Sequence, residues 1–492
     1  MDMLESLLAQ IDWVSFAGWA ALLLQFSLAV GVILRVMLTR HPPGSAFAWI
    51  ILTIILPYVG FALYILIGER PVGRWRAYRL KKMLARWESI TNLQSEHSVE
   101  LPASQRHKGL VRLAQRLGDI AMTSGSTLEL LSNSDVALTR IIEDVRGARK
   151  NIYMEFYIWS EGGLADVVAK EIMCAARRGV DCRILIDALG SRAFLKSEWP
   201  QRMQKAGVHL LTALPMHFLS FSKGRADLRM HRKTVVIDDM VGYTGSLNMF
   251  DPRHFKQDEG VGEWVDAMVR VQGTAVADLK LVFCFDWALQ PDDTGRQNEF
   301  LPTQPTAPKG QARVVVVPSG PTPVQDANQR LILEAINCAR HRILITTPYF
   351  VPGEALALAL QNAAYRGVDV RLCLPEKSDS HFVQWASRRY FDGLMSAGVK
   401  ILAFHEGLLH TKAITVDDDF AVFGTVNMDN RSMHLNFEMM LLIFDSKFVK
   451  ELISLQRSYE ARSKLIDSAV WYRRPVRERL LEGFCYLLSP LL

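Results

Sequence analysis

Two long apolar runs open the chain. Residues 13–34 and 42–68 contain no charged side chain. A helix rises 1.5 Å per residue, so a run of about 20 residues crosses a hydrocarbon core of about 30 Å. Two such runs so close together favour a membrane hairpin over buried helices of a soluble core, and Pro57 is expected to kink or break the second. The acidic leader before residue 13 argues against a cleaved signal peptide.

From about Gly109 the pattern changes to alternating strands and helices. Short apolar segments predict strands at 152–157, 182–187, 343–345 and 370–374. The strings RRGVDCRILI and YRGVDVRLCL are near copies, and each reads as a helix ending at a C-cap glycine before a strand. The chain is therefore predicted to form two α/β lobes with mixed β-sheets flanked by helices.

These patterns divide the chain into five parts. The predicted parts are a transmembrane hairpin (1–70), a basic juxtamembrane segment and linker (71–108), a first lobe (109–287), a linker rich in Pro, Gln, Thr and Gly (288–311), and a second lobe with a C-terminal interfacial tail (312–492). The tail, WYRRPVRERLLEGFCYLLSPLL, is too short to span a bilayer and combines aromatic, basic and apolar residues.

Charge and cysteine content narrow the class of protein. A net charge of +6 is too small to argue for nucleic acid, and the basic excess is local. Seven Arg and Lys residues lie between 70 and 86, interleaved with Trp75 and Tyr78. The positive-inside rule places this side in the cytoplasm. The six cysteines have neither zinc-ligand nor disulfide-framework spacing, which suits a reducing compartment.

One motif occurs twice, with its members 179 residues apart. It reads H-x-K-x4-D, followed by G-[ST]-x-N. The first copy is His231, Lys233, Asp238, Ser246 and Asn248; the second is His410, Lys412, Asp417, Thr425 and Asn427.

Each copy reads as a β-hairpin turning at an Asp-Asp pair. Equal distance from the turn sets His231 opposite Ser246 and His410 opposite Thr425. Alternation along a strand puts the histidine, lysine, hydroxyl and amide on one face, whereas the aspartate at the turn points elsewhere.

This set of side chains suits a phosphodiester. Lysine, amide and hydroxyl donors can hold the non-bridging oxygens. One neutral histidine can attack phosphorus while a protonated one supplies the leaving oxygen with a proton. For a single copy, the alternative is that these residues are ordinary members of a strand without a catalytic role. Two intact copies weigh against that alternative.

Carboxylates are the expected partners of the histidines. Glu438, in the string NFE, is predicted to orient a catalytic histidine, and Asp266 or Glu263 is predicted to do so from the first half. Just before the first motif, Phe218 to Phe221 are followed by Lys223, Arg225 and Arg229, as expected of a loop at a lipid interface.

The duplicated motif resembles that of the phospholipase D superfamily, and within it the bacterial cardiolipin synthases. The strings carrying the resemblance are RMHRKTVVIDDMVGYTGSLNM, TTPYFVPGEAL and GLLHTKAITVDDDFAVFGTVNMDNRS. Met230 and Thr425 depart from the usual residues, but neither is a nucleophile, an acid or a charged clamp.

The resemblance implies a catalytic set and an activity. It makes His231, Lys233, Asp238, His410, Lys412 and Asp417 catalytic, with His231 the nucleophile, and Ser246, Asn248, Thr425 and Asn427 phosphate-binding. The implied reaction converts two phosphatidylglycerol molecules to cardiolipin and glycerol through a phosphohistidine, with no cofactor, metal or nucleic acid, at the bacterial inner membrane with cytoplasmic lobes.

Two other functions stay open. A phospholipase D-type hydrolase would use the same residues and pass the phosphatidyl group to water. A non-enzymatic membrane scaffold gives no reason for both motifs to be intact and ranks last. The sequence leaves open the oligomeric state, the use of phosphatidylethanolamine as donor, and whether the hairpin spans or re-enters the membrane.

Overall fold

The computed structural model describes residues 13–39, 43–68, 105–214, 228–290, 306–320 and 326–489. These residues form two compact units, one made of the N-terminal helices and one that contains both motif-bearing halves. The basic cluster at 70–86 and the loop at 218–225 lie outside the described residues.

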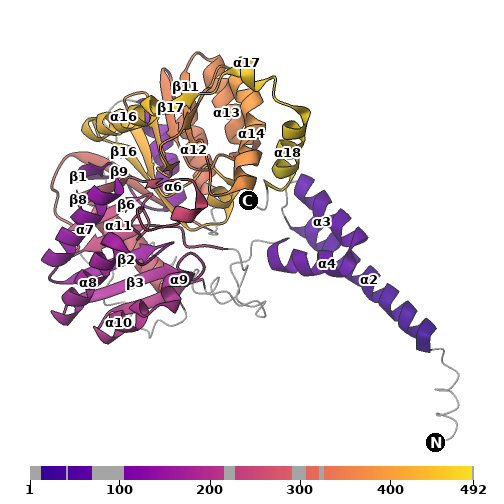
Figure 1. Cartoon of the computed structure of the whole chain (residues 1–492), viewed down its shortest axis with the longest axis horizontal. Coiled ribbons are helices and arrows are strands. Elements are labelled where there is room, and N and C mark those ends of the chain that lie inside the picture. The colour runs from indigo at the N-terminus through magenta and orange to yellow at the C-terminus, as the bar shows by residue number, and fades with distance from the viewer. Residues whose placement is uncertain are drawn as a thin grey trace, which may run out of the picture. The chain divides into compact units, whose positions relative to one another are not determined.

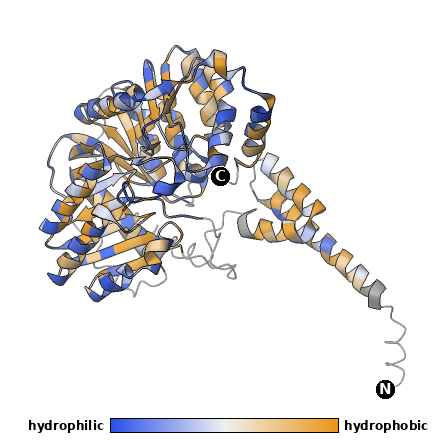
Figure 2. Cartoon of the chain, in the orientation of Figure 1, coloured by the Kyte–Doolittle hydropathy of each residue, from blue (hydrophilic) through white to orange (hydrophobic). Residues whose placement is uncertain are grey.

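The N-terminal unit consists of α2 (Trp13–Leu38), α3 (Pro43–Ile55), α4 (Pro57–Leu63) and a π-helical turn (Tyr64–Gly68). Figure 2 shows these helices as largely apolar. Among the described residues, one helical segment, Ala17–Leu38, is long and apolar enough to cross a membrane.

The second apolar run is broken at Pro57, as its sequence predicts. Pro57 begins α4, and the backbone N–H of Leu56 still donates to Leu52 O of α3. Helix α4 then packs back on α3, where a Cβ on Gly60 would lie 2.7 Å from Thr53 Cα. The second run is therefore two short packed helices rather than one straight span.

The larger unit is built on one continuous 15-stranded sheet (Figure 1). From one edge, the first half contributes β4 (His209–Ala213), β3 (Asp181–Asp187), β2 (Asn151–Phe156), β5 (Thr234–Ile237), β6 (Val241–Gly245), β8 (Met268–Gly273) and β1 (Thr123–Leu131). From the other edge, the second half contributes β17 (Ser463–Leu465), β12 (Lys400–Phe404), β11 (Asp369–Pro375), β10 (Arg342–Thr346), β14 (Ala413–Val416), β15 (Phe420–Gly424), β16 (Glu438–Phe444) and β9 (Ala312–Ser319).

The two halves repeat one topology and meet at an antiparallel pair, β1 and β9. In each half, three parallel strands (β2, β3 and β4; β10, β11 and β12) lie beside the antiparallel motif hairpin. The predicted mixed-sheet α/β fold is confirmed. Gly179 and Gly367 have φ values of +92° and +87°, as expected of helix C-cap glycines.

Helices from both halves cover the sheet. The first half contains α7 (Ser134–Gly147), α8 (Gly163–Arg177), α9 (Arg192–Lys196), α10 (Trp199–Lys205) and α11 (Ala275–Ala288). The second contains α12 (Ala327–Cys338), α13 (Gly353–Tyr365), α14 (His381–Ser396), α15 (Asn430–His434), α16 (Ser446–Ala461), α17 (Ser468–Trp471) and α18 (Val476–Leu487).

The hydrophobic cores show how the halves interlock. Residues of α11 and α16 share one core with central strands from both halves. Helix α6 (Lys108–Gly118) packs its Leu110, Val111 and Ala114 into the core of the second half, with β9 and α12. The start of the predicted first lobe thus belongs structurally to the second, because the apolar face of α6 completes that core.

Each motif hairpin turns through three residues rather than two. Ile237 pairs with Val241 in the first copy and Val416 with Phe420 in the second. The register is therefore shifted by one residue from the sequence prediction. Asp238 and Asp417 have φ values of +53° and +52°, a conformation that aspartate tolerates better than most side chains.

The motif aspartates hold these turns. Asp238 accepts hydrogen bonds from the backbone N–H groups of residues 149, 150 and 151, and Asp417 accepts them from residues 340, 341 and 342. Arg106 also forms an ion pair with Asp417. Both carboxylates fix the hairpin turn against the start of the strand that pairs with the hairpin, β2 in the first half and β10 in the second.

We expect Asp417→Asn to lower the free energy of unfolding by about 2–3 kcal/mol, because hydrogen bonds to a charged, buried acceptor are weakened. The matched control is Asp418→Asn. Asp418 is 68% exposed and forms a surface ion pair with Arg342, so its loss should cost less than about 1 kcal/mol. Denaturation in detergent compares the two. An Asp417→Asn protein with unchanged stability and no activity would contradict the structural role.

Candidate active site

Each motif histidine is anchored to a strand of the other half. The N–H of His231 donates to Phe437 O at 2.9 Å, immediately before Glu438. The N–H of His410 donates to Val265 O at 2.9 Å, immediately before Asp266. The second anchor belongs to a small parallel ribbon of β7 (Trp264–Val265) and β13 (Leu408–Leu409).

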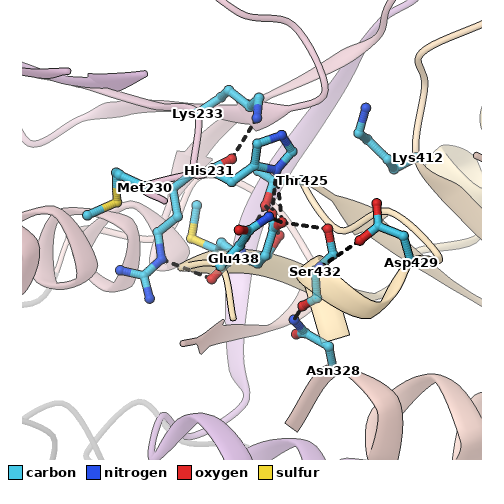
Figure 3. Close-up of polar contacts among 12 residues, drawn as sticks. Met230, His231, Lys233, Asn328, Lys412, Thr425, Asp429, Ser432 and Glu438 are labelled. Atoms are coloured by element: carbon cyan, nitrogen blue, oxygen red, sulfur yellow. Dashed lines mark hydrogen bonds and ion pairs between the residues drawn. The ribbon is translucent and has the colours of Figure 1, made fainter. Parts of the chain in front are cut away.

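This backbone pairing brings each imidazole to a carboxylate from the opposite half. His231 Nδ1 lies 2.8 Å from Glu438 Oε1, and His410 Nδ1 lies 2.6 Å from Asp266 Oδ1. Figure 3 shows the His231 ring directed at Glu438. A carboxylate accepts the Nδ1 proton, so Nε2 of each neutral ring carries the free lone pair.

Of the two carboxylates predicted for the first half, Asp266 is the one beside a histidine. Asp266 is fully buried, whereas Glu263 is exposed. The backbone carbonyl of Glu263 accepts a hydrogen bond from Leu408 N at 2.9 Å. The structure places Glu438 and Asp266 each beside a histidine of the opposite half, a crossed pairing that the sequence did not reveal. That they orient catalytic histidines stays a prediction.

The motif hydroxyls support the carboxylates. Thr425 Oγ1 donates to Glu438 and accepts from Met439 N at 2.9 Å. Ser246 Oγ accepts from Ala267 N at 3.0 Å, and hydrogen bonding from Ser246 helps to lower the pKa of Asp266. The Thr425 hydroxyl therefore binds the Glu438 carboxylate, and the Ser246 hydroxyl binds the backbone next to Asp266. Binding of a substrate phosphate by these two hydroxyls stays a prediction.

Glu438 is held by further donors from α15 and from the segment between α15 and β16. Ser432 Oγ donates to Glu438 Oε1 at 2.8 Å, and Asn436 Nδ2 donates to the same oxygen at 3.2 Å. The backbone carbonyl of Glu438 accepts from Arg232 Nε at 2.9 Å. These contacts, several of which are drawn in Figure 3, fix both the backbone and the carboxylate beside His231.

The two lysines adopt equivalent positions. Lys233 Nζ donates to His231 O, and Lys412 Nζ donates to His410 O, each at 2.6 Å. Burial lowers the pKa of Lys233 to about 8 and holds the pKa of Lys412 well below its usual value. Each ammonium therefore retains donors for an anion in a poorly solvated position.

Charges from both motifs act on one another. The Lys412 ammonium contributes to lowering the pKa of His231, and the Lys233 ammonium contributes to lowering that of His410. The principal cause in both histidines is burial, which lowers the pKa to about 4 for His231 and about 3 for His410. Both rings are consequently neutral at pH 7, and the two motifs form a single electrostatic site.

The motif amides have different partners. Asn248 Oδ1 accepts from Ile158 N at 3.1 Å, and its buried Nδ2 has no partner within the described part of the chain. Hydrogen bonding from Asn427 opposes the burial that raises the pKa of Asp429. Asn248 is thus the amide that offers a donor, while Asn427 supports the loop carrying Asp429.

Asp238 and Asp417 lie apart from this site. Their carboxylates are occupied by backbone N–H groups at the hairpin turns, as described above. The structure therefore does not bring these two members of the predicted catalytic set to the histidines. One short strand separates each histidine from the turn that carries its motif aspartate. The length of that strand fixes the spacing of the motif, although the histidine lies in the site and the aspartate holds the turn.

Two aromatic residues beside the histidines were missed from the sequence. The Trp264 ring lies 4.4 Å from the His410 ring, and the Tyr157 ring lies 5.1 Å from the His231 ring, centroid to centroid. Their positions offered a signal, since Tyr157 directly follows strand β2 and Trp264 stands two residues before Asp266. Both rings exclude water from the imidazoles.

The halves differ beneath the site. Under the first motif, Arg232 forms a buried ion pair with Asp286, and burial raises the pKa of neighbouring Glu155 to about 8. In the second half, the neutral Gln456 donates to Leu344 O and Ala413 O and accepts from Thr415. The duplicated site is therefore symmetric in its histidines, lysines and carboxylates but not in their support.

Within the described residues, no three His, Cys, Asp or Glu side chains gather as a metal site would require. The positive charge near the histidines comes from Lys233 and Lys412.

Comparisons with known proteins agree with this geometry. A family model described as "Cardiolipin synthase, PLD-like domain" matches residues 141–273 and 332–457, which contain the two motifs. A second model, "Phospholipase_D-nuclease N-terminal", matches residues 27–69. The phosphatidylserine synthase of Haemophilus influenzae Rd KW20 shares the fold, with a TM-score of 0.59 at 17% identity over 78% of this chain and all of that one.

Curated relatives extend the likeness along the chain. Cardiolipin synthase A of Escherichia coli O1:K1 / APEC is 41% identical over 488 residues, covering 97% of this chain and 99% of the relative. The protein of the same name from the K12 / DH10B strain matches equally. With a matching N-terminal segment and two matching motif-bearing regions, the chain belongs to the cardiolipin synthase family of phospholipase D-like proteins and is membrane-associated.

Proposed function

We propose that this chain transfers a phosphatidyl group from one phosphatidylglycerol to a second, forming cardiolipin and glycerol. The observation that carries the proposal is the crossed pairing of two buried imidazoles with two buried carboxylates. Relatives that match nearly the full length are cardiolipin synthases. The resemblance of the motif strings supports phosphatidylglycerol as both donor and acceptor.

In the first step Nε2 of His231 attacks phosphorus, and the bond from phosphorus to the glycerol oxygen breaks. Protonated His410 gives its proton to that oxygen, and glycerol leaves. The Glu438 carboxylate compensates the positive charge that develops on the His231 ring. Both rings are neutral in the free protein, so the arriving phosphate anion is expected to raise the pKa of His410 and load it with a proton.

In the second step the terminal hydroxyl of another phosphatidylglycerol attacks the same phosphorus. His410 takes the hydroxyl proton, the phosphorus–nitrogen bond breaks, and cardiolipin forms. Lys233, Lys412 and the Nδ2 group of Asn248 are positioned to donate to the non-bridging oxygens in both steps. The assignment of attack to His231 rests on the family resemblance, since the pairing itself is nearly symmetric.

Burial of the site favours an alcohol acceptor over water. His231, His410, Lys233 and Lys412 are each at most 7% exposed. Trp264 and Tyr157 cover the rings. A site that excludes water slows hydrolysis of a phosphohistidine and lets a lipid hydroxyl compete. A phospholipase D-type hydrolase would use the same residues, but it would need water to reach the phosphohistidine.

Purified protein given phosphatidylglycerol should form cardiolipin and glycerol in equal amounts, also with a chelator present. Lipid chromatography and an enzymatic glycerol assay measure both products, and His410→Ala is the inactive control. Phosphatidic acid as the main product would establish the hydrolase instead. Loss of activity on chelation would contradict catalysis by lysines, amides and histidines alone.

We further propose that the chain sits in the bacterial cytoplasmic membrane with its larger unit on the cytoplasmic side. The basic cluster at 70–86 supports this orientation. The lengths of the two apolar runs favour a multi-pass hairpin with both ends in the cytoplasm, and the break of the second run at Pro57 leaves a re-entrant pair as the alternative.

The orientation predicts which introduced cysteines react from outside intact cells. A cysteine at Arg40, between the apolar runs, should react with an impermeant thiol reagent, whereas one at Gln94 should react only after lysis. The reverse pattern would overturn the orientation. Failure at both positions in intact cells would mean a re-entrant pair, and only the spanning hairpin would then be abandoned.

A further inference from the structure

Helix α18 is attached to the protein through its charged face. The carboxylate of Glu482, which is fully buried, accepts from Arg388 Nε at 2.9 Å and from Arg474 Nη2 at 2.8 Å. One turn earlier, Glu478 accepts from Arg388 Nη2 at 2.6 Å. Ion pairs to α14 and to the segment before α18 therefore hold the inward face of this helix, together with the buried Cys485, which packs in a small apolar cluster with Val351 and Ala386.

The outward face of α18 carries the hydrocarbon. Val476, Leu480, Phe484 and Leu487 are 66%, 70%, 56% and 75% exposed. Their spacings of four, four and three residues place them on one stripe of the helix, opposite Glu478 and Glu482. We call these four residues the apolar stripe. A contiguous exposed stripe of this kind marks an interaction surface rather than scattered surface residues.

Arginines border the apolar stripe. At 100° per residue, the exposed Arg477 and Arg479 fall on either side of it, and Arg473 is exposed just before the helix. Exposed Val470 and Tyr472 continue the apolar surface toward α17. An apolar face with basic flanks and an aromatic residue at its end is complementary to the surface of a bilayer that contains anionic lipid.

The end of α18 contacts the loop that supports the active site. The carbonyl of Ser489 accepts from Asn430 Nδ2 at 2.8 Å. Asn430 follows Asp429, whose carboxylate caps α15 by accepting from Ser432 N at 2.7 Å. Ser432 in turn donates to Glu438, the partner of His231. Three consecutive contacts thus connect the chain beyond the apolar stripe with the candidate active site.

We propose that α18 lies in the interface of an anionic phospholipid bilayer and brings this side of the larger unit to the lipid surface. The apolar stripe packs among acyl chains, and Arg473, Arg477 and Arg479 contact lipid phosphates. Lipid substrate then reaches the site from the bilayer. The entry of lipid at this side rests on the proposed function, whereas the docking of the helix does not.

Site-directed spin labels measure the docking in the full-length protein reconstituted into phosphatidylglycerol and phosphatidylethanolamine vesicles. Labels are placed through Leu480→Cys, and through Val136→Cys as the control, with Cys174 and Cys338 replaced by serine. Val136 is 46% exposed on α7 and lies outside the apolar stripe. Power saturation compares collision with oxygen, which concentrates in lipid, and with a water-soluble nickel chelate.

The proposal predicts a severalfold higher ratio of oxygen to nickel accessibility at position 480 than at position 136. Equal ratios would mean that the stripe is solvated, and would overturn it. Low accessibility to both reagents would mean that protein covers the stripe, either a second copy or another segment of this chain, and would overturn it as well.

Activity supplies the second test. The double variant L480E/F484E should form cardiolipin in vesicles roughly tenfold more slowly than wild type, a loss equivalent to about 1.4 kcal/mol. In mixed detergent micelles, where lipid is delivered without docking, it should match wild type, and Val136→Glu should match in both. Equal vesicle rates would refute the role in lipid entry. If wild type makes no cardiolipin at all, the proposed function fails, while the label measurement still decides the docking.

Discussion

The crossed exchange of carboxylates between the two halves is the constraint on which the site depends. Neither half supplies the carboxylate that contacts its own histidine. Glu438 of the second half contacts His231, and Asp266 of the first half contacts His410. A backbone hydrogen bond to the residue just before each carboxylate positions the pair: the N–H of His231 donates to Phe437, and the N–H of His410 donates to Val265. Duplication of the module is therefore a structural requirement and not only a doubling of groups.

The fold keeps the two halves in register for this exchange. Strands β1 and β9 join the half-sheets into one, and helices α11 and α16 pack on strands of both halves. A shear between the halves would have to break the continuous sheet and this shared core. Rigid support of this kind suits a reaction in which two rings must act on one phosphorus from opposite sides.

The sequence predicted much of this, and its errors have identifiable causes. Periodicity and the repeated strings gave the mixed α/β fold, because short apolar strands and glycine C-caps are local signals. Residue types gave the histidines, the lysines, Glu438 and Asp266. The hairpin register was wrong by one residue because an Asp at positive φ permits a three-residue turn that spacing alone does not reveal.

Other features depended on contacts between distant segments, which a single sequence does not encode locally. The hydrogen bond from Thr425 to Glu438 depends on the pairing of β16 with β15, and the predicted contact of Thr425 with phosphate stays a prediction. Helix α6 was expected in the first lobe and packs in the core of the second. The contact between Trp264 and His410 likewise arises where β7 pairs with β13. The same pairing brings Asp266 to His410, which lies 144 residues further along the chain.

The most direct test of the crossed pairing is rapid-quench measurement of adduct formation on His231. A phosphodiester with a good leaving group needs no general acid, so its burst reports only attack by the nucleophile. Glu438→Gln should slow this burst about 100-fold or more, by analogy with removal of the charge behind a catalytic histidine. Asp266→Asn should leave the burst within about fivefold of wild type while slowing turnover, because its partner His410 acts as acid and base. A burst abolished by Asp266→Asn but preserved in Glu438→Gln would contradict the account.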